Sequence, residues 1–162
     1  MLTDFYKLSM AVGEALQKKS WKLVTAESCT GGFLAQVITS IAGCSKWFER
    51  GFVTYSRESK QEILGVPAEM IQCYGVVSAE VAQAMAEGAL KHSHANIAVS
   101  ITGFAGPAGG TIDKPVGTVF FGFAFRQSST QVMSQLFIGD RESVREQAVR
   151  FALENLLSRI LD

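Results

Sequence analysis

Residues 25–32, with the sequence TAESCTGG, place two potential nucleophiles where a short strand is expected to turn into a helix. The first backbone N–H groups of a helix lack acceptors within it and lie at the positive end of the helix dipole. Such a corner can bind an anion or the oxyanion of a tetrahedral intermediate. Ser28 or Cys29 would lie there beside its own oxyanion hole, and the segment does not distinguish between them. An equally simple interpretation is structural, in which Ser28 or Thr30 caps the helix and the glycines only allow a tight turn.

A serine nucleophile needs a base, and the two histidines of the chain are poorly placed to supply one. His92 and His94 lie two positions apart at the polar end of an expected helix, so their side chains point in different directions. We therefore expect both to be surface residues, which argues against a Ser-His-Asp triad and a Cys-His pair. The lack of a suitable histidine also counts against Cys29, although a thiolate would be favoured at a helix N-terminus.

Lys60 is the remaining candidate base, because it follows an expected strand at 47–56 by one short turn. If that strand lies beside the strand that ends at Ser28, the Lys60 amine and the Tyr55 hydroxyl could both reach Ser28. A lysine acts as a base near neutral pH only where burial or a nearby cation lowers its pKa. On spacing alone, a solvated Lys60 and a Tyr55 that packs at a sheet edge are the simpler interpretation.

Two further segments carry groups suited to an anionic substrate. Residues 103–110, GFAGPAGG, can bring backbone amides close to a ligand, although they match neither a P-loop nor a dinucleotide fingerprint. Arg141 and Arg145 lie one turn apart on the expected last helix, where they could clamp a phosphate or a carboxylate. Surface pairing with acidic neighbours explains the two arginines equally well.

The elements that must position these groups follow from hydrophobic periodicity and turn residues. We expect helices at about 4–19, 33–41, 58–64 and 78–92, one near Pro67 and one from Asp140, and strands running into Ser28 and at 47–56, 95–101, 116–125 and 132–138, with a turn at 127–130. This order predicts a three-layer α/β/α fold with a mixed, largely parallel sheet of about five strands, including a late antiparallel hairpin. Sites in such folds collect beyond the carboxyl ends of the strands, where Ser28, Tyr55, Thr102 and the Asp140 corner are expected to meet.

Length and composition favour one domain spanning residues 1–162, large enough for a core of its own. Lysines and arginines number 15 and acidic residues 15, so charge gives no case for a nucleic-acid partner. No apolar run reaches the length of a membrane span, and the N-terminus does not resemble a signal peptide. The three cysteines (Cys29, Cys44 and Cys73) lack metal-type spacing, so we expect reduced thiols in a cytoplasmic protein.

Four segments taken together resemble the CinA C-terminal domain family. They are TAESCTGG at 25–32, GFVTYS at 51–56, SITGFAGP at 100–107 followed by Gly109 and Gly110, and KPVGTV at 114–119. The resemblance covers nearly the whole chain in the family's order and spacing, and it is to the form without the additional N-terminal domain of the larger CinA proteins. Its best-understood members hydrolyse the carboxamide of nicotinamide mononucleotide (NMN).

The resemblance implies a Ser/Lys amidohydrolase of pyridine nucleotide salvage that needs no metal or other cofactor. Ser28 would be the nucleophile, Lys60 the base and Tyr55 an assisting hydroxyl. The implied substrate-binding residues are Cys29, Thr30, Gly31 and Gly32 around the oxyanion, Thr102 and Gly103 in a loop of the site, and Arg141 or Arg145 at the phosphate. A homo-oligomer, expected to be a dimer, is also implied. The competing hypotheses are a non-catalytic nucleotide- or anion-binding module and an amidohydrolase of another small amide.

Overall fold

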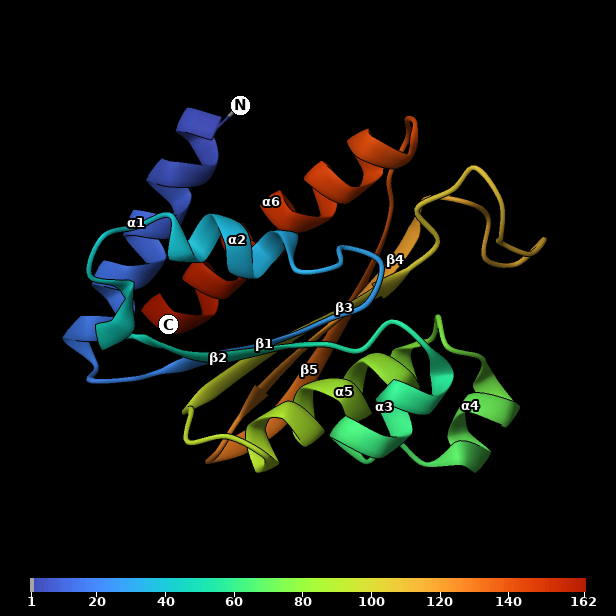
Figure 1. Cartoon of the computed structure of the whole chain (residues 1–162), viewed down its shortest axis with the longest axis horizontal. Coiled ribbons are helices and arrows are strands. Elements are labelled where there is room, and N and C mark those ends of the chain that lie inside the picture. The colour runs from blue at the N-terminus through green and yellow to red at the C-terminus, as the bar shows by residue number, and fades with distance from the viewer. Residues whose placement is uncertain (1) are drawn as a thin grey trace.

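A five-stranded sheet with helices on both faces forms the frame of residues 2–162, the part of the chain that this computed structural model describes (Figure 1). The elements in chain order are α1 (Leu2–Lys18), β1 (Leu23–Glu27), α2 (Phe33–Thr39), the 3-10 helix η1 (Cys44–Lys46), β2 (Phe48–Val53), α3 (Arg57–Leu64), α4 (Ala68–Tyr74), α5 (Ala79–Lys91), β3 (Ile97–Gly103), β4 (Thr118–Phe125), β5 (Ser128–Leu136) and α6 (Arg141–Leu161).

The strand order of the sheet is β2-β1-β3-β4-β5. β1 is parallel to both β2 and β3, whereas β4 is antiparallel to β3 and to β5. Four strands therefore run in one direction, and only β4 runs against them. This arrangement confirms the predicted three-layer fold and the mixed, largely parallel sheet with its late antiparallel hairpin.

The two faces of the sheet carry different helices. In Figure 1, α1, α2 and α6 cover one face, and α3, α4 and α5 cover the other. Side chains of β1 alternate between the two layers, because Leu23 packs into the core beneath α1 and α6 while Val24 and Ala26 pack into the core beneath α5. Because helices cover both faces, all five positions of β1 are buried, including those of the polar residues Thr25 and Glu27.

Three helices begin at side chains that accept a hydrogen bond from the helix's own first turn. The caps are Ser56 for α3, Ser78 for α5 and Asp140 for α6, and they accept from the N–H groups of Ser59, Val81 and Ser143. The predicted helix starts at Ser78 and Asp140 are thereby confirmed. The cap at Ser56 also explains why β2 ends at Val53 and does not continue to residue 56 as predicted.

The predicted turn at residues 127–130 is wrong, because β5 begins at Ser128. Phe125 pairs with Ser128, which leaves only Arg126 and Gln127 to form the turn. β5 lies at the edge of the sheet and most of its residues are half-buried or exposed, so it begins with polar residues. Exposed edge strands and turns share this composition, which is why the pattern was misleading.

β1, β2 and β3 end at the same edge of the sheet. Glu27, the last residue of β1, pairs in register with Val53 of β2 and with Ile101 of β3. The residues that follow these strands therefore begin close together, as the parallel arrangement predicts. No helix within residues 2–162 is both long enough and apolar enough to cross a lipid bilayer.

Candidate active site

Ser28 is the first residue after β1, and its backbone is held by both neighbouring strands. Its N–H donates to the carbonyl of Ile101 at 2.9 Å, while the carbonyl of Glu27 accepts the N–H of Thr54 at 2.9 Å. The Ser28 side chain lines a cavity of about 190 Å³, together with Cys29, Tyr55, Lys60, Val76, Val77, Thr102, Gly103 and Phe104. The structure thus brings the segments after β1, β2 and β3 to one cavity.

Lys60 points into this cavity from the first turn of α3. Helical side chains lean toward the helix N-terminus, and here that direction leads back to the ends of β1 and β2. Lys60 is only 1% exposed, and its Nζ lies 2.9 Å from the Ser28 Oγ. The same nitrogen donates to the backbone carbonyls of Thr54 at 2.7 Å and Tyr55 at 3.0 Å. The amine therefore has three partners, of which only one is a side chain.

Burial of Lys60 changes its protonation. Desolvation of the ammonium form lowers the pKa of Lys60 from 10.5 to about 8, against a smaller opposing effect of the Cys29 thiolate. A neutral amine has two N–H donors and one lone pair. The carbonyls of Thr54 and Tyr55 accept the two N–H groups, so the lone pair faces the Ser28 hydroxyl. This geometry suits proton transfer from Ser28 to Lys60.

Tyr55 contributes to this site through its backbone as well as its side chain. Its carbonyl accepts from Lys60, whereas its exposed hydroxyl accepts a hydrogen bond from Arg141 Nη2 at 3.2 Å. Arg141 also donates from Nη1 to the carbonyl of Gly106 at 2.7 Å. Arg141 thus joins α6 to the loop after β3 and to the rim of the cavity.

Cys29 lies beside Ser28 but has the properties of a buried thiol. Desolvation raises the pKa of Cys29 from 9.0 to about 11, and this effect outweighs the opposing charges of Arg145 and Lys60. The thiol therefore stays protonated near neutral pH, where a cysteine nucleophile would need to be a thiolate. Between the two candidates that the sequence left open, the geometry favours Ser28.

The N-terminus of α2 is occupied by a carboxylate of the chain itself. Glu27, 1% exposed, accepts the N–H groups of Leu34 at 2.8 Å and Ala35 at 3.1 Å, and the Thr30 hydroxyl at 2.7 Å. α2 begins at Phe33, which confirms the predicted start of this helix, and the turn of residues 28–32 separates it from Ser28. Its first-turn donors are therefore not available to a ligand. A carboxylate at the last position of a buried strand was the signal that sequence reasoning missed.

The turn between Ser28 and α2 leaves some N–H groups free. Gly31 donates to the carbonyl of Ser28 at 3.0 Å, so its amide is not available as an oxyanion donor. The amides of Cys29 and Thr30 have no acceptor within residues 2–162 and remain candidates. Gly31 and Gly32 both have positive φ, 57° and 103°, so they form the turn that other residues would strain.

Arg145 supports this turn from α6. Its Nε donates to the carbonyl of Cys29 and its Nη2 to that of Thr30, both at 3.1 Å. The guanidinium also lies 5.9 Å from the centroid of the Phe33 ring. Both predicted arginines thus reach the site, Arg145 at the turn and Arg141 at the rim.

Thr102 and Gly103 lie at the end of β3 and line the cavity. The Thr102 hydroxyl donates to the carbonyl of Val76 at 2.8 Å, so it holds a neighbouring segment. A Cβ on Gly103 would lie 2.7 Å from Val119 Cγ2 and 2.9 Å from the Thr118 carbonyl oxygen, which leaves no space for a larger residue. The structure also adds Val76 and Val77 to the site, which the sequence did not single out.

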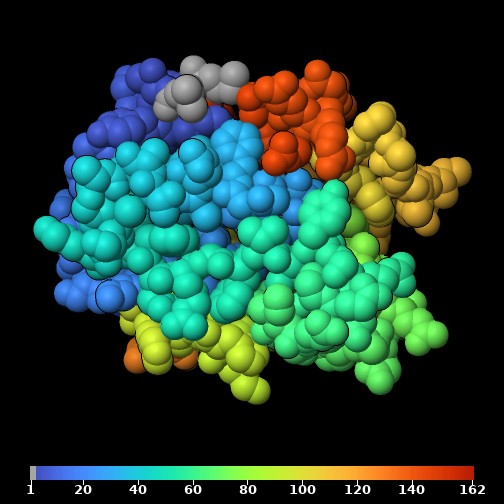
Figure 2. All heavy atoms as spheres, viewed as in Figure 1, coloured from blue at the N-terminus to red at the C-terminus, as the bar shows by residue number. Residues whose placement is uncertain are grey.

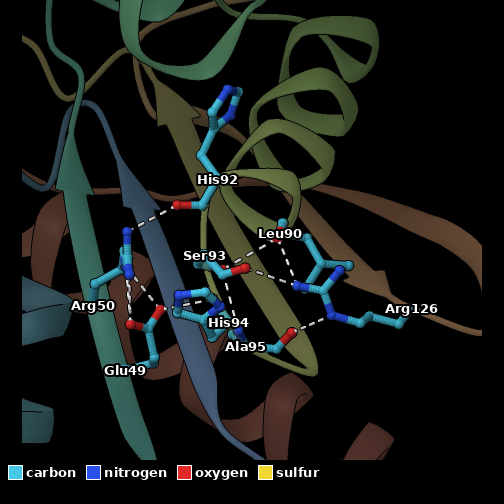
Figure 3. A network of polar contacts seen from close by, with 8 residues as sticks. All are labelled: Glu49, Arg50, Leu90, His92, Ser93, His94, Ala95 and Arg126. Atoms are coloured by element: carbon cyan, nitrogen blue, oxygen red, sulfur yellow. Dashed lines mark hydrogen bonds and ion pairs between the residues drawn. The ribbon is translucent and has the colours of Figure 1, made fainter.

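The two histidines lie away from this cavity, in the polar network of Figure 3. Both are exposed, which confirms the prediction of surface positions. The His92 carbonyl accepts from Arg50, and the His94 N–H donates to the carboxylate of Glu49. Nowhere in residues 2–162 do three or more His, Cys, Asp or Glu side chains gather in a way that could hold a metal ion.

Comparison with known proteins extends over almost the entire chain. The model of the CinA C-terminal domain matches residues 5–160. Nicotinamide-nucleotide amidohydrolase PncC of Escherichia coli (strain K12) is 50% identical over 159 residues, which cover 98% of this chain and 96% of that protein. PncC of Enterobacter agglomerans is 49% identical over 156 residues, covering 96% and 95%.

The fold is also shared with solved structures. The crystal structure of competence/damage inducible protein CihA from Agrobacterium tumefaciens matches with a TM-score of 0.94 and 39% identity, over 98% of this chain and 96% of that one. The family model, the relatives and this structural match agree with one another. The chain therefore belongs to the CinA C-terminal domain family.

Proposed function

We propose that this protein hydrolyses the carboxamide of NMN to nicotinic acid mononucleotide and ammonia, as a step of pyridine nucleotide salvage. Two relatives that are 49% and 50% identical over nearly their whole lengths carry the name nicotinamide-nucleotide amidohydrolase. The observation that carries the proposal is the buried Lys60 amine, which lies 2.9 Å from the Ser28 hydroxyl. Its two backbone acceptors direct the lone pair at that hydroxyl.

The first half of the reaction forms an acyl-enzyme. Neutral Lys60 takes the proton of Ser28 while Oγ attacks the carboxamide carbon, and a C–O bond forms. The free amides of Cys29 and Thr30 stabilise the oxyanion. Lys60, now an ammonium, gives its proton to the amide nitrogen, the C–N bond breaks, and ammonia leaves. The positive pyridinium ring makes the carboxamide carbon more electrophilic.

The second half returns Ser28 to its starting state. Lys60 is neutral again after giving its proton to the leaving amide nitrogen, so it can take a proton from a water molecule that attacks the acyl carbon. The ester bond to Oγ then breaks, and Lys60 returns the proton to Ser28. Nicotinic acid mononucleotide leaves with a new carboxylate.

The phosphate of the substrate is assigned to Arg141. This arginine is exposed at the rim and contacts the Tyr55 hydroxyl, so it can turn toward an anion outside the cavity. Arg145 is half-buried and holds the carbonyls of Cys29 and Thr30, so its part is to fix the turn.

Ammonia release from NMN without added metal tests the proposal. Ser28→Ala removes the nucleophile and Lys60→Met removes the base, and each is expected to lower kcat by about 10³-fold or more. Ser129→Ala and Lys7→Met, at exposed positions of β5 and α1, are the matched controls. Turnover by Ser28→Ala at a rate comparable to the controls would exclude the acyl-enzyme. A wild type that binds NMN but releases no ammonia would exclude the amidohydrolase.

A further inference from the structure

One wall of the cavity is formed by a segment without regular secondary structure. Val76 and Val77 line the cavity from the connection between α4 and α5. We call residues 74–77, which are the last residue of α4 and the three residues after it, the pocket wall. Backbone carbonyls in such a segment need donors from elsewhere in the molecule.

Side chains supply a donor to every carbonyl of the pocket wall. Lys114 Nζ donates to Tyr74 at 3.2 Å and Val77 at 2.7 Å, Ser78 Oγ donates to Gly75 at 2.9 Å, and Thr102 Oγ1 donates to Val76 at 2.8 Å. Two of these donors belong to β3 and the loop after it. Donors from distant parts of the chain thus hold the carbonyls of Tyr74, Val76 and Val77, while the neighbouring Ser78 holds that of Gly75.

Lys114 is held so that its side chain can make these contacts. Its N–H donates to the Thr111 hydroxyl at 3.0 Å, and its carbonyl accepts the N–H of Thr111 at 2.8 Å, which closes a tight turn. Its Nζ lies 5.6 Å from the centroid of the Phe120 ring, and Phe120 pairs across the sheet with Thr102. Figure 2 shows the loop after β3, in yellow-orange, projecting at one end of the molecule. Lys114 joins this loop to the body of the protein.

We propose that Lys114 is a positioning residue that holds Val76 and Val77 as one side of a slot for a flat aromatic ring, and so makes the site selective for ring carboxamides. This inference rests on the proposed function, in which Ser28 attacks such an amide. Phe104 lines the same cavity, so apolar groups from two segments meet beside the nucleophile. A planar ring would cover these apolar surfaces, whereas a small aliphatic amide would leave them in contact with water.

The size of the cavity agrees with recognition of a ring. At about 190 Å³ it is smaller than the roughly 300 Å³ or more of pockets that enclose a whole drug-sized ligand. A pyridine ring with its carboxamide would occupy it, while the ribose and phosphate would extend toward Tyr55 and Arg141 at the rim. The apolar sides of this slot are Val76, Val77 and Phe104, whereas Ser28 and Lys60 line another part of the same cavity.

Substitutions of Lys114 test this role against a merely structural one. Lys114→Met removes both donors to the pocket wall, and Lys114→Arg keeps donors that can reach the same carbonyls. We expect Lys114→Met to raise KM for NMN by about tenfold with little change in kcat, because the bound substrate and the transition state lose the same contacts. Lys114→Arg should lower KM part of the way back. In a Ser28→Ala background, calorimetric titration with NMN should show a similar increase in Kd.

The rate at which a small reagent modifies Ser28 shows whether a substitution disturbs the whole site. Methanesulfonyl fluoride reacts with an activated serine, forming an O–S bond and releasing fluoride, and it does not need the ring slot. Its rate of modification of Ser28 should change less than about twofold in Lys114→Met, since Lys60 is untouched. Lys7→Met is the control. If Lys114→Met folds poorly, Thr102→Val replaces it in the test, because it removes the donor to Val76 and should also weaken NMN binding.

The outcomes separate this inference from the proposed function. Equal NMN affinity in wild type, Lys114→Met and Thr102→Val overturns the inference alone. Modification of Ser28 that slows in proportion to the loss of NMN binding also overturns it, because Lys114 then supports the whole site. A wild type that neither binds nor hydrolyses NMN overturns the proposed function, and the inference with it.

Discussion

At the scale of single residues, the proposed chemistry depends on how Lys60 carries its proton. A solvated lysine with a pKa near 10.5 is almost entirely an ammonium at neutral pH and cannot act as a base. Burial lowers the pKa of Lys60 to about 8, so a useful fraction of the amine is neutral. The backbone carbonyls of Thr54 and Tyr55 accept two N–H groups in both protonation states, and Ser28 Oγ accepts the third N–H of the ammonium form, so the amine can be buried.

The pH dependence of turnover should follow this group. We expect kcat/KM for NMN to rise with pH and level off above about pH 8, because only the neutral amine can accept the Ser28 proton. Initial rates between about pH 6 and pH 9.5 measure the profile. A rate that is flat across this range, or that falls between about pH 7 and pH 8, would contradict Lys60 as the base.

Protein stability should also depend on pH through Lys60. Its native pKa of about 8 lies below its ordinary 10.5, so the unfolded chain binds more protons between these values. Stability from this group therefore increases as pH rises from about 8 to 10.5, and it is lost again as pH falls to about 8. The free energy of unfolding of wild type and of Lys60→Met, measured by urea denaturation over this pH range, should differ by an amount that grows with pH.

The titration of Cys29 changes protein stability with pH in the opposite direction, so its contribution must be separated from that of Lys60. Its raised pKa, from 9.0 to about 11, makes a contribution that is lost as pH rises through that interval. The comparison with Lys60→Met removes most of this contribution, since both proteins contain Cys29 and the charge of Lys60 is the smallest of the influences on its pKa. A stability difference that is constant or that shrinks between about pH 8 and 10.5 would mean that Lys60 is not desolvated in the native state.

At the scale of elements, α2 depends on an anion that the chain supplies. α2 has only seven residues, and its cap residue Gly32 has no side chain to accept from the first turn. The Glu27 carboxylate takes that role by accepting from Leu34 and Ala35. Because Glu27 also precedes Ser28, the same bonds fix the turn on which Ser28 lies.

Replacement of Glu27 by Gln tests this element. The glutamine oxygen can accept from one side, but its amide group would place a donor against the N–H of Ala35 or Leu34. We expect Glu27→Gln to lower the free energy of unfolding by about 1–3 kcal/mol, measured by urea denaturation. Glu62→Gln, at an exposed position of α3, should change it by less than about 0.5 kcal/mol. Equal effects of the two substitutions would show that the buried carboxylate is not needed.

At the scale of the whole molecule, the shared carboxyl edge of β1, β2 and β3 places the site. Ser28, Lys60 and Thr102 come from separate parts of the chain, and they meet because these parallel strands end together. Hydrophobic periodicity was sufficient to predict the strands and the three layers. It also indicated which loops would lie at that edge, because strand direction in an α/β fold leaves few alternatives.

What the sequence alone could not predict are contacts that depend on exact spatial neighbours. Spacing left Lys60 undecided, since strand order determines whether residues 32 positions apart touch, and only the family resemblance selected it. The carbonyls around Nζ are backbone geometry that residue types do not encode directly, and the contact of the Glu27 carboxylate with the first turn of α2 depends on how the intervening turn folds. The pocket wall escaped prediction because its valines resemble ordinary core residues, and Lys114 a surface charge.

The acceptors around Lys60 have an evolutionary consequence. Two of its three partners are main-chain carbonyls, so a mutation at position 54 or 55 replaces a side chain but leaves the acceptor in place. Under the proposed mechanism, selection for proton transfer therefore acts directly on two side chains, those of Ser28 and Lys60. The rim, where the Tyr55 side chain lies, can diverge while descendants inherit the reactive pair intact. Under the proposed function, a change of amide substrate through the rim therefore need not remove the reactive pair.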